Sequence, residues 1–239
     1  MKAIVSGHTK GLGAALAEEL ARRGIAVLGL ARGGAPALAA RYPALIDEVA
    51  LDLADNAALA RWLEGPALTD FFRGSRVALL FNNAGTVQPI GALPHQDVAA
   101  VGQAIALNVG APLMLAAALA RLAGERRIVH VSSGAGRAAY AGWSVYCATK
   151  AALDQHARAV ALDAQPGLRI CSLAPGVVDT PMQAEIRHSS SDLFPARQRF
   201  IDLQRDGELT APAQCAVHLV DYALSERFGA NPVEDVRSL

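Results

Sequence analysis

Short apolar runs alternate with longer runs of helical period along most of this chain. The short runs predict strands near residues 2–6, 25–30, 46–51, 76–81, 127–132, 169–173 and 234–237. The longer, alanine-rich runs predict helices near residues 12–23, 35–41, 56–63, 96–108, 112–122, 144–163 and 212–224. Such alternation is typical of a parallel sheet with helices on both faces. We therefore predict an α/β fold with a doubly wound parallel sheet of about seven strands.

One stretch departs from this pattern. Residues 181–207 are polar and weakly periodic, with a run of serines and several charges. Polar loops of this kind often cover a binding site, so we expect residues 183–209 to form a substrate lid. A plain surface excursion without a gating role is the alternative. Because no repeat, linker or composition break divides the chain, we predict a single domain over residues 1–239.

Composition narrows the classes of function. Of the 239 residues 52% are hydrophobic, and 22 basic residues balance 22 acidic ones. This balance gives no long-range attraction to nucleic acid or to an anionic membrane. The three cysteines form no CxxC pair and the six histidines show no metal-ligand spacing, so we expect neither a disulfide framework nor a metal site. The longest apolar stretch, residues 111–120, is too short to span a bilayer, and we expect a cytoplasmic protein.

A glycine-rich loop joins the first predicted strand to the first predicted helix. It reads SGHTKGLG over residues 6–13, and its glycines let the backbone approach a pyrophosphate at the helix N-terminus. The arrangement is typical of a Rossmann-fold dinucleotide site, although GxxxGxG differs from the common GxGxxG spacing and a tight turn is the alternative. The residues predicted here to bind the cofactor are Gly7, Thr9, Lys10, Gly11, Leu12 and Gly13.

The end of the second predicted strand favours NADP(H) over NAD(H). NAD-selective sites usually carry an acid there for the ribose hydroxyls, whereas this chain has Ala31 followed by Arg32. A guanidinium can bind a 2′-phosphate with paired hydrogen bonds, and Lys10 can add a second positive charge. Both cations can equally be ordinary solvated side chains. Asp52 and Leu53, after the third strand, are expected at the adenine, with a cap of the next turn as the alternative for Asp52.

Candidate catalytic groups lie in the second half of the chain. Tyr146 and Lys150 are four residues apart on a predicted helix, so they share one face. An ammonium close to a phenol lowers the pKa of the tyrosine, which makes the phenol a workable acid near neutral pH. Ser133 ends the fifth predicted strand, where its hydroxyl can hold a carbonyl oxygen. A helix-surface pair and a simple turn are the alternatives.

Together these residues resemble the short-chain dehydrogenase/reductase family over essentially the whole chain. The motifs that carry the resemblance are SGHTKGLG at 6–13, NNAG at 82–85, Asn108 in ALNVG, VSSGAG at 131–136, YCATK at 146–150 and PGVVDT at 175–180. They occur in the family's order and spacing. Ser6 stands where the family more often has threonine, which is a mild departure because either hydroxyl can hydrogen-bond locally.

The resemblance implies a role for each matching residue. Tyr146 would be the acid and base, Ser133 would orient the carbonyl, and Lys150 would modulate Tyr146 and contact the ribose. Asn108 would sustain a water-linked proton relay through a break in its helix. Asn82, Ala84 and Gly85 would line the adenosine ribose and stabilise the centre of the sheet. The remaining cofactor contacts would be Pro175, Gly176, Val178 and Thr180. Of these, Val178 and Thr180 would hold the nicotinamide carboxamide.

Several stretches are similar to the sepiapterin reductase and benzil reductase branch of that family, namely residues 83–91, 175–183 and the polar segment from 189. This likeness implies a carbonyl reductase that uses NADP(H) to reduce a ketone or vicinal dicarbonyl, with Tyr146 as proton donor. A 3-oxoacyl or hydroxysteroid-type reductase remains an alternative, as does a non-catalytic NADP(H)-sensing protein. The family also implies a homodimer or homotetramer that pairs through the helices near 112–122 and 144–163, with burial of these helix faces against the protein's own sheet as the alternative.

Overall fold

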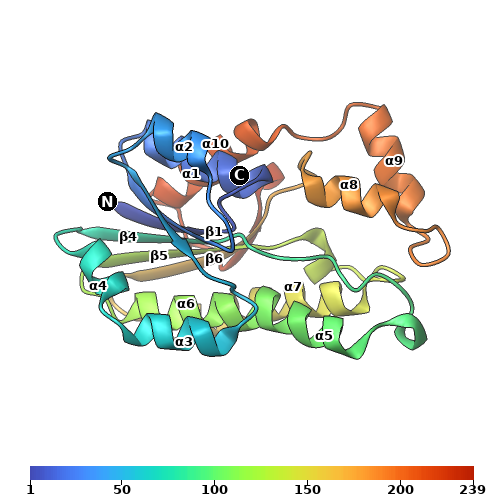
Figure 1. Cartoon of the computed structure of the whole chain (residues 1–239), viewed down its shortest axis with the longest axis horizontal. Coiled ribbons are helices and arrows are strands. Elements are labelled where there is room, and N and C mark those ends of the chain that lie inside the picture. Colours follow the sequence, from blue (N-terminus) through green and yellow to red (C-terminus); the bar gives the residue numbers. More distant parts are fainter.

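The computed structural model describes the whole chain, residues 1–239, around one seven-stranded sheet (Figure 1). Every pair of neighbouring strands is parallel, and the strand order is β3-β2-β1-β4-β5-β6-β7. The predicted doubly wound sheet is therefore confirmed. The strands are β1 (Lys2–Ser6), β2 (Ala26–Ala31), β3 (Ile46–Ala50), β4 (Val77–Asn82), β5 (Glu125–Val131), β6 (Leu168–Ala174) and β7 (Val233–Asp235).

Helices cover both faces of the sheet (Figure 1). One face carries α1 (Gly11–Arg22), α2 (Pro36–Arg41) and α10 (Pro212–Leu224). The other carries α3 (Asn56–Glu64), α5 (Val98–Ile105), α6 (Ala111–Ala120) and α7 (Ser144–Leu162). These elements lie within a few residues of the predicted ones. The sequence did not predict the short helix α4 (Ala67–Phe72), whose six residues are too few for a helical period to be distinguished.

The sheet separates two apolar cores, which explains why the strands read as continuous hydrophobic runs. Leu16 and Leu20 of α1 pack with Leu219 of α10 on one face, and all three are fully buried. On the other face, Leu59 of α3 and Leu119 of α6 are likewise fully buried. With both faces covered, the carboxyl edge of the sheet remains open. The strand order reverses between β1 and β4, and ligands bind at such a switch point.

The polar segment forms more regular structure than its sequence predicts. It contains α8 (Pro181–His188) and α9 (Arg197–Arg205), which lie together beyond one end of the sheet (Figure 1). Ile186, Phe194 and Phe200 are buried there in an aromatic cluster with Trp143. Three buried side chains among many polar ones give only a weak periodic signal, which explains why the sequence pattern did not predict these helices.

One helical stretch, Val98–Ala120, is long and apolar enough to cross a membrane by length and composition. It runs through α5, a π-helical turn and α6, and 28% of its most apolar window is buried. This is longer than the stretch 111–120 on which the sequence-based exclusion of a span rested. A single helix of this kind is weak support for a membrane span, because core helices of globular proteins have the same length and composition.

Candidate active site

A cleft of about 850 Å³ opens at the carboxyl edge of the sheet. It brings together the glycine loop, the ends of β2 and β3, the start of α7 and the segment after β6, which are far apart in the sequence. The predicted site residues that line it are Gly7, Thr9, Lys10, Gly11, Leu12, Gly13, Arg32, Asp52, Leu53, Ala84, Gly85, Ser133, Tyr146, Lys150, Pro175, Gly176, Val178 and Thr180.

The geometry of the glycine loop fits a pyrophosphate. Gly7 and Gly11 have φ angles of +70° and +56°, in the left-handed region that favours glycine. A Cβ on Gly13 would lie 2.1 Å from the carbonyl oxygen of Gly7, so α1 packs directly against the loop only because this position has no side chain. The first turn of α1 holds no acidic residue, so its N–H groups and helix dipole present a positive end to the cleft.

The end of β4 is tied to the end of β1 by hydrogen bonds. The Oγ of Ser6 accepts from the backbone N–H groups of Asn83 and Ala84 at 2.9 and 3.0 Å. The side-chain amide of Asn83 donates to the Ser6 carbonyl oxygen at 3.0 Å. Asn83 also lines the cleft, although the sequence analysis did not select it. Its position in NNAG was the available signal.

Asn82 is buried at the end of β4. It is 2% exposed and does not line the cleft. Its amide donates to the Pro112 carbonyl oxygen at 3.2 Å and contacts His130 Nδ1 at 3.1 Å. The predicted contact of Asn82 with the adenosine ribose therefore finds no support in the position of its side chain and stays a prediction, whereas these contacts agree with its other predicted role, which is to stabilise the centre of the sheet. Side chains alternate across a strand, so adjacent residues at the end of β4 face opposite directions, and Asn82 packs beneath the sheet edge.

The predicted adenosine end of the cleft carries two unpaired cations. Lys10 and Arg32 both line the cleft, and neither forms an ion pair with an acidic residue. Asp52 also lines it, and its Oδ1 accepts from the backbone N–H of Ala54 at 2.9 Å. Asp52 thus caps the next turn, as the alternative interpretation had it, and it also lines the cleft.

Tyr146, Lys150 and Ser133 meet at the centre of the cleft. Tyr146 and Lys150 lie on one face of α7 and are 6% and 5% exposed. The Lys150 ammonium donates to the Val131 carbonyl oxygen at 2.8 Å and lies 5.7 Å from the centroid of the Tyr146 ring. Ser133 follows β5, where its Oγ accepts from the backbone N–H of Ala135 at 3.1 Å, and it lines the cleft together with Tyr146. The helical spacing and the strand end therefore converge as the sequence predicted.

The expected pKa of Tyr146 is wrong in direction. Burial raises the pKa of Tyr146 to about 12, although the nearby Ser133 hydroxyl acts to lower it. Burial also lowers the pKa of Lys150 to about 8, which weakens its hold on a proton. Lys150 directs its ammonium at the Val131 carbonyl instead of the phenol. Desolvation of the phenolate therefore outweighs the attraction of the ammonium.

Asn108 lies behind the cleft wall in a break of its helix. A π-helical turn, Ala106–Gly110, interrupts the run from α5 to α6. Asn108 is 1% exposed; its Oδ1 accepts from the Thr86 N–H and its amide donates to the Thr86 carbonyl, both at 2.8 Å. A Cβ on Gly85 would lie 3.3 Å from Asn108 Oδ1 and 3.8 Å from Lys150 Nζ, so both polar groups converge behind Gly85.

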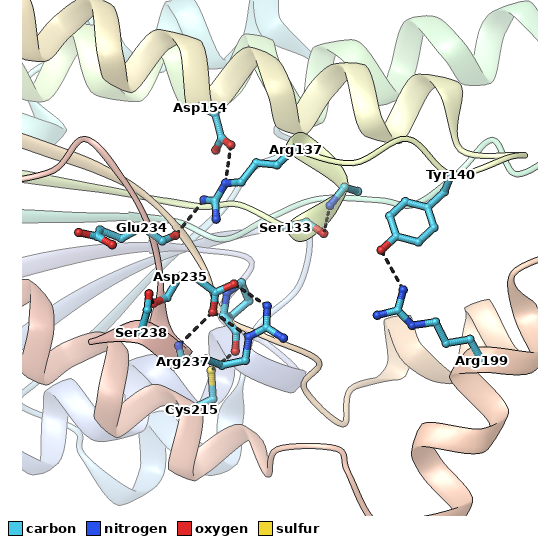
Figure 2. Close-up of polar contacts among 12 residues, drawn as sticks. Ser133, Arg137, Tyr140, Asp154, Arg199, Cys215, Glu234, Asp235, Arg237 and Ser238 are labelled. Atoms are coloured by element: carbon cyan, nitrogen blue, oxygen red, sulfur yellow. Dashed lines mark hydrogen bonds and ion pairs between the residues drawn. The ribbon is translucent and has the colours of Figure 1, made fainter.

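A buried carboxylate near the middle of α7, which the sequence analysis did not select, holds this helix against the sheet. Asp154, 1% exposed, accepts hydrogen bonds from Ser132 Oγ at 2.6 Å and Ser172 Oγ at 2.7 Å. It also pairs with Arg137 at 3.1 Å, and Arg137 donates onward to the Glu234 carbonyl (Figure 2). Asp154 acts to raise the pKa of Lys150 against the effect of burial. Its position four residues after Lys150 was the available signal.

The opposite end of the cleft is aromatic. Tyr140, Trp143 and Phe200 line it, and Trp143 stacks on Phe194 with ring centroids 4.3 Å apart. Trp143 also lies edge-on to Tyr146, with centroids 5.1 Å apart. Arg199 of α9 donates to the Tyr140 hydroxyl at 3.1 Å at the rim (Figure 2). The sequence analysis missed these aromatic residues because they come from two segments about 50 residues apart, 140–143 and 194–200.

Comparison with known proteins identifies the family. A family model described as short chain dehydrogenase matches residues 1–191. This chain belongs to the short-chain dehydrogenases. Members of this family are oxidoreductases that bind a nicotinamide cofactor and a small-molecule substrate. The family assignment therefore indicates an oxidoreductase enzyme.

Several characterised relatives cover nearly the full length of this short-chain dehydrogenase. It is 30% identical over 237 residues to a benzil reductase ((S)-benzoin forming) of Bacillus cereus, covering 94% of each chain. It is 31% identical over 242 residues to the sepiapterin reductase of Mus musculus, covering 94% of this chain and 92% of the relative. These similarities support the branch to which the motifs pointed.

Solved structures agree with this placement. A short-chain dehydrogenase/reductase from Burkholderia vietnamiensis is 54% identical with a TM-score of 0.73, covering 100% of this chain and 97% of the other. A short-chain dehydrogenase from Burkholderia cenocepacia, solved in complex with NADP, is 28% identical with a TM-score of 0.79, covering 97% and 94%.

Proposed function

We propose that this protein is an NADP(H)-dependent carbonyl reductase that reduces a ketone or vicinal dicarbonyl, with Tyr146 as the proton donor. The observation that carries the proposal is that Tyr146, Ser133 and Lys150 line the same cleft as the glycine loop. The dinucleotide supplies the hydride, so the protein itself must bind, orient and move a proton. A single domain that acts in the cytoplasm completes the proposal.

Different residues of the cleft bind different parts of the cofactor. The N–H groups of the glycine loop and α1 hold the pyrophosphate, while Lys10 and Arg32 hold the 2′-phosphate. The Lys150 ammonium contacts the nicotinamide ribose. Val178 and Thr180, which line the cleft after β6, hold the carboxamide. The absence of acidic partners for Lys10 and Arg32 supports NADP(H) over NAD(H), because both cations are free for a phosphate.

The proton reaches the substrate oxygen from Tyr146. Its raised pKa, about 12, keeps the phenol protonated at neutral pH, as a donor for carbonyl reduction must be. The Ser133 hydroxyl donates a hydrogen bond to the carbonyl oxygen and fixes it beside the phenol. Lys150 and Asn108 converge behind Gly85, which supports a path that replaces the proton through water.

The aromatic end of the cleft supports a compact aromatic substrate. Flat rings pack favourably against Trp143 and Phe200, which line that end. The similarity to benzil and sepiapterin reductases points to the same class of substrate. Residues 183–209, which include most of α8 and all of α9, would act as the lid, because Met182, Gln183 and Arg199 line the cleft at or within that segment.

The replacement Tyr146→Phe tests the catalytic assignment. It removes the acidic proton and keeps the ring, so we expect binding of NADPH to persist while benzil reduction falls by about three orders of magnitude, the scale of general acid catalysis. NADPH oxidation is followed by absorbance and cofactor binding by fluorescence titration. Tyr42→Phe, outside the cleft lining, is the matched control and should retain full activity. Full activity in Tyr146→Phe would refute the assignment.

A substrate panel separates the alternatives. Preference for benzil or sepiapterin supports this proposal, whereas preference for acyl thioesters or steroid ketones indicates one of the other reductase types. Binding of NADPH without turnover of any carbonyl indicates a sensor.

We also propose a homodimer or homotetramer. Three apolar side chains on α5 and α7 are exposed in the single chain, and contact with a second copy would bury them: Val98 (85% exposed), Ile105 (50%) and Leu162 (85%). Sedimentation analysis measures that state directly.

A further inference from the structure

His8 belongs to the glycine loop but does not line the cleft. Its side chain is completely buried and packs against Gly29 of β2. A Cβ on Gly29 would lie 2.5 Å from the imidazole ring, so β2 accommodates His8 only because it has no side chain there. The loop is thus anchored on the second strand by a histidine that the cofactor site itself does not use.

Glu48 of β3 receives hydrogen bonds from two separate segments. It lies beside Gly29 in the register of β2 and β3. Its Oε1 accepts from His8 Nε2 at 2.6 Å and from the backbone N–H of Ala35 at 2.6 Å. Its side chain is 24% exposed, so these contacts are partly shielded from water. One carboxylate therefore connects the glycine loop to the turn between β2 and α2.

These two connected segments carry the two free cations of the cleft. Lys10 stands in the glycine loop, and Arg32 begins the turn that ends at Ala35, the residue that precedes α2. Both side chains can bind one phosphate only when their backbones stand at a suitable distance. A contact that fixes the loop against the turn therefore fixes the geometry of the anion site without touching the anion.

We propose that His8 and Glu48 form a positioning pair that sets the spacing of Lys10 and Arg32 and thereby the preference for the 2′-phosphate of NADP(H). The inference rests on the proposed cofactor and deepens it. Neither residue contacts the dinucleotide in this account. NADH lacks the 2′-phosphate, so its binding depends on the glycine loop and the nicotinamide contacts and not on the spacing of the two cations.

The dissociation constants of NADPH and NADH, measured in parallel, test this pair. We expect Glu48→Ala and His8→Ala to raise the Kd of NADPH about tenfold, the scale of one hydrogen bond to a charged group. The Kd of NADH should change less than about twofold. Glu48→Gln keeps an oxygen that accepts from Ala35 or His8, so it should retain most of the preference. Asp47→Ala, on the same strand without these contacts, is the matched control.

The outcomes separate this inference from the proposed function. If the unaltered enzyme binds NADPH more tightly than NADH but Glu48→Ala leaves the ratio unchanged, the positioning pair is refuted and the cofactor assignment stands. If Glu48→Ala weakens both cofactors equally, the contact serves only general stability, and the pair is again refuted. If the unaltered enzyme prefers NADH, both proposals fall. Because Glu48 is partly exposed, its truncation leaves no core cavity, and the test remains decisive even if His8→Ala unfolds.

Discussion

At its proposed dinucleotide end the cleft is walled in part by the backbone of a glycine loop, whereas at its proposed substrate end it is walled by large aromatic side chains. Gly7, Gly11 and Gly13 form the first wall within one short loop. Trp143 and Phe200 belong to the second wall and lie on elements far apart in the chain. A backbone wall recognises a ligand that is constant across a family, while a side-chain wall can change with the substrate and leave the first wall intact.

Gly13→Ala should disrupt the proposed dinucleotide end, and it has the largest expected effect of the three tests of this comparison. Its Cβ would lie 2.1 Å from the Gly7 carbonyl oxygen, so the loop must move away from α1. We expect the Kd of NADPH to rise about a hundredfold, as overpacking against rigid backbone costs on the order of 1–3 kcal/mol. Gly102→Ala in α5, where a Cβ meets nothing within 4 Å, is the control. An unchanged Kd in Gly13→Ala would contradict the packing argument.

Phe200→Ala should affect the substrate end and leave the dinucleotide end intact. Phe200 is 6% exposed and its ring centroid lies 5.4 Å from that of Trp143. We expect the KM for benzil to rise about tenfold and the protein to lose about 3 kcal/mol of stability, with the Kd of NADPH nearly unchanged. Phe228→Ala, a truncation in the core that α1 and α10 form against the sheet, should lose similar stability with no change in KM. Equal KM values in the two variants would show that the aromatic wall does not contact substrate.

The pH dependence of kcat/KM tests Lys150, which lies between the two ends of the cleft. Its expected effect is the smallest of the three tests. The pKa of Lys150 is lowered to about 8, so its positive charge is present below pH 8 and lost as the pH rises through that value. We expect kcat/KM for reduction to fall above about pH 8, since this parameter reports ionisation in the free enzyme. Tyr146, with a pKa of about 12, stays protonated over this range and adds no second limb. In Lys150→Arg the fall near pH 8 should disappear; its persistence there would assign it to another group.

The sequence predicted the parts of the molecule that local chemistry determines. The central strands β1, β2 and β4 are almost wholly buried apolar runs, and the glycine loop and the four-residue spacing of Tyr146 and Lys150 follow from backbone geometry, so the positions of these elements could be predicted directly. The pKa of Tyr146 could not be predicted, because it depends on burial among residues distant in sequence, such as Val87 and Phe194 of the same apolar cluster. The side on which Asn82 lies could not be read either, because strand alternation gives a useful answer only once the last strand residue is known.

The aromatic wall and the buried carboxylate were missed for a related reason. Phe194 and Phe200 sit in a polar stretch whose overall pattern is weak, and only their contact with Trp143 gives them a function in packing. Asp154 reads as an ordinary surface acid on a helix until Ser132 and Ser172 from two strands meet it. Contacts between distant segments decide both cases, and a single sequence does not report them.

The placement of Asp154 on α7 also constrains how this gene can vary in length. Residues 146 to 154 present the phenol, the ammonium and the carboxylate to three different sets of partners on a single helix. Because each residue turns an α-helix by about 100°, one inserted or deleted codon in this stretch would rotate the carboxylate away from its serines or the phenol away from the cleft. Substitutions at the solvent-facing positions of residues 146–154 should therefore preserve activity, whereas insertions and deletions there should abolish it and be removed by selection.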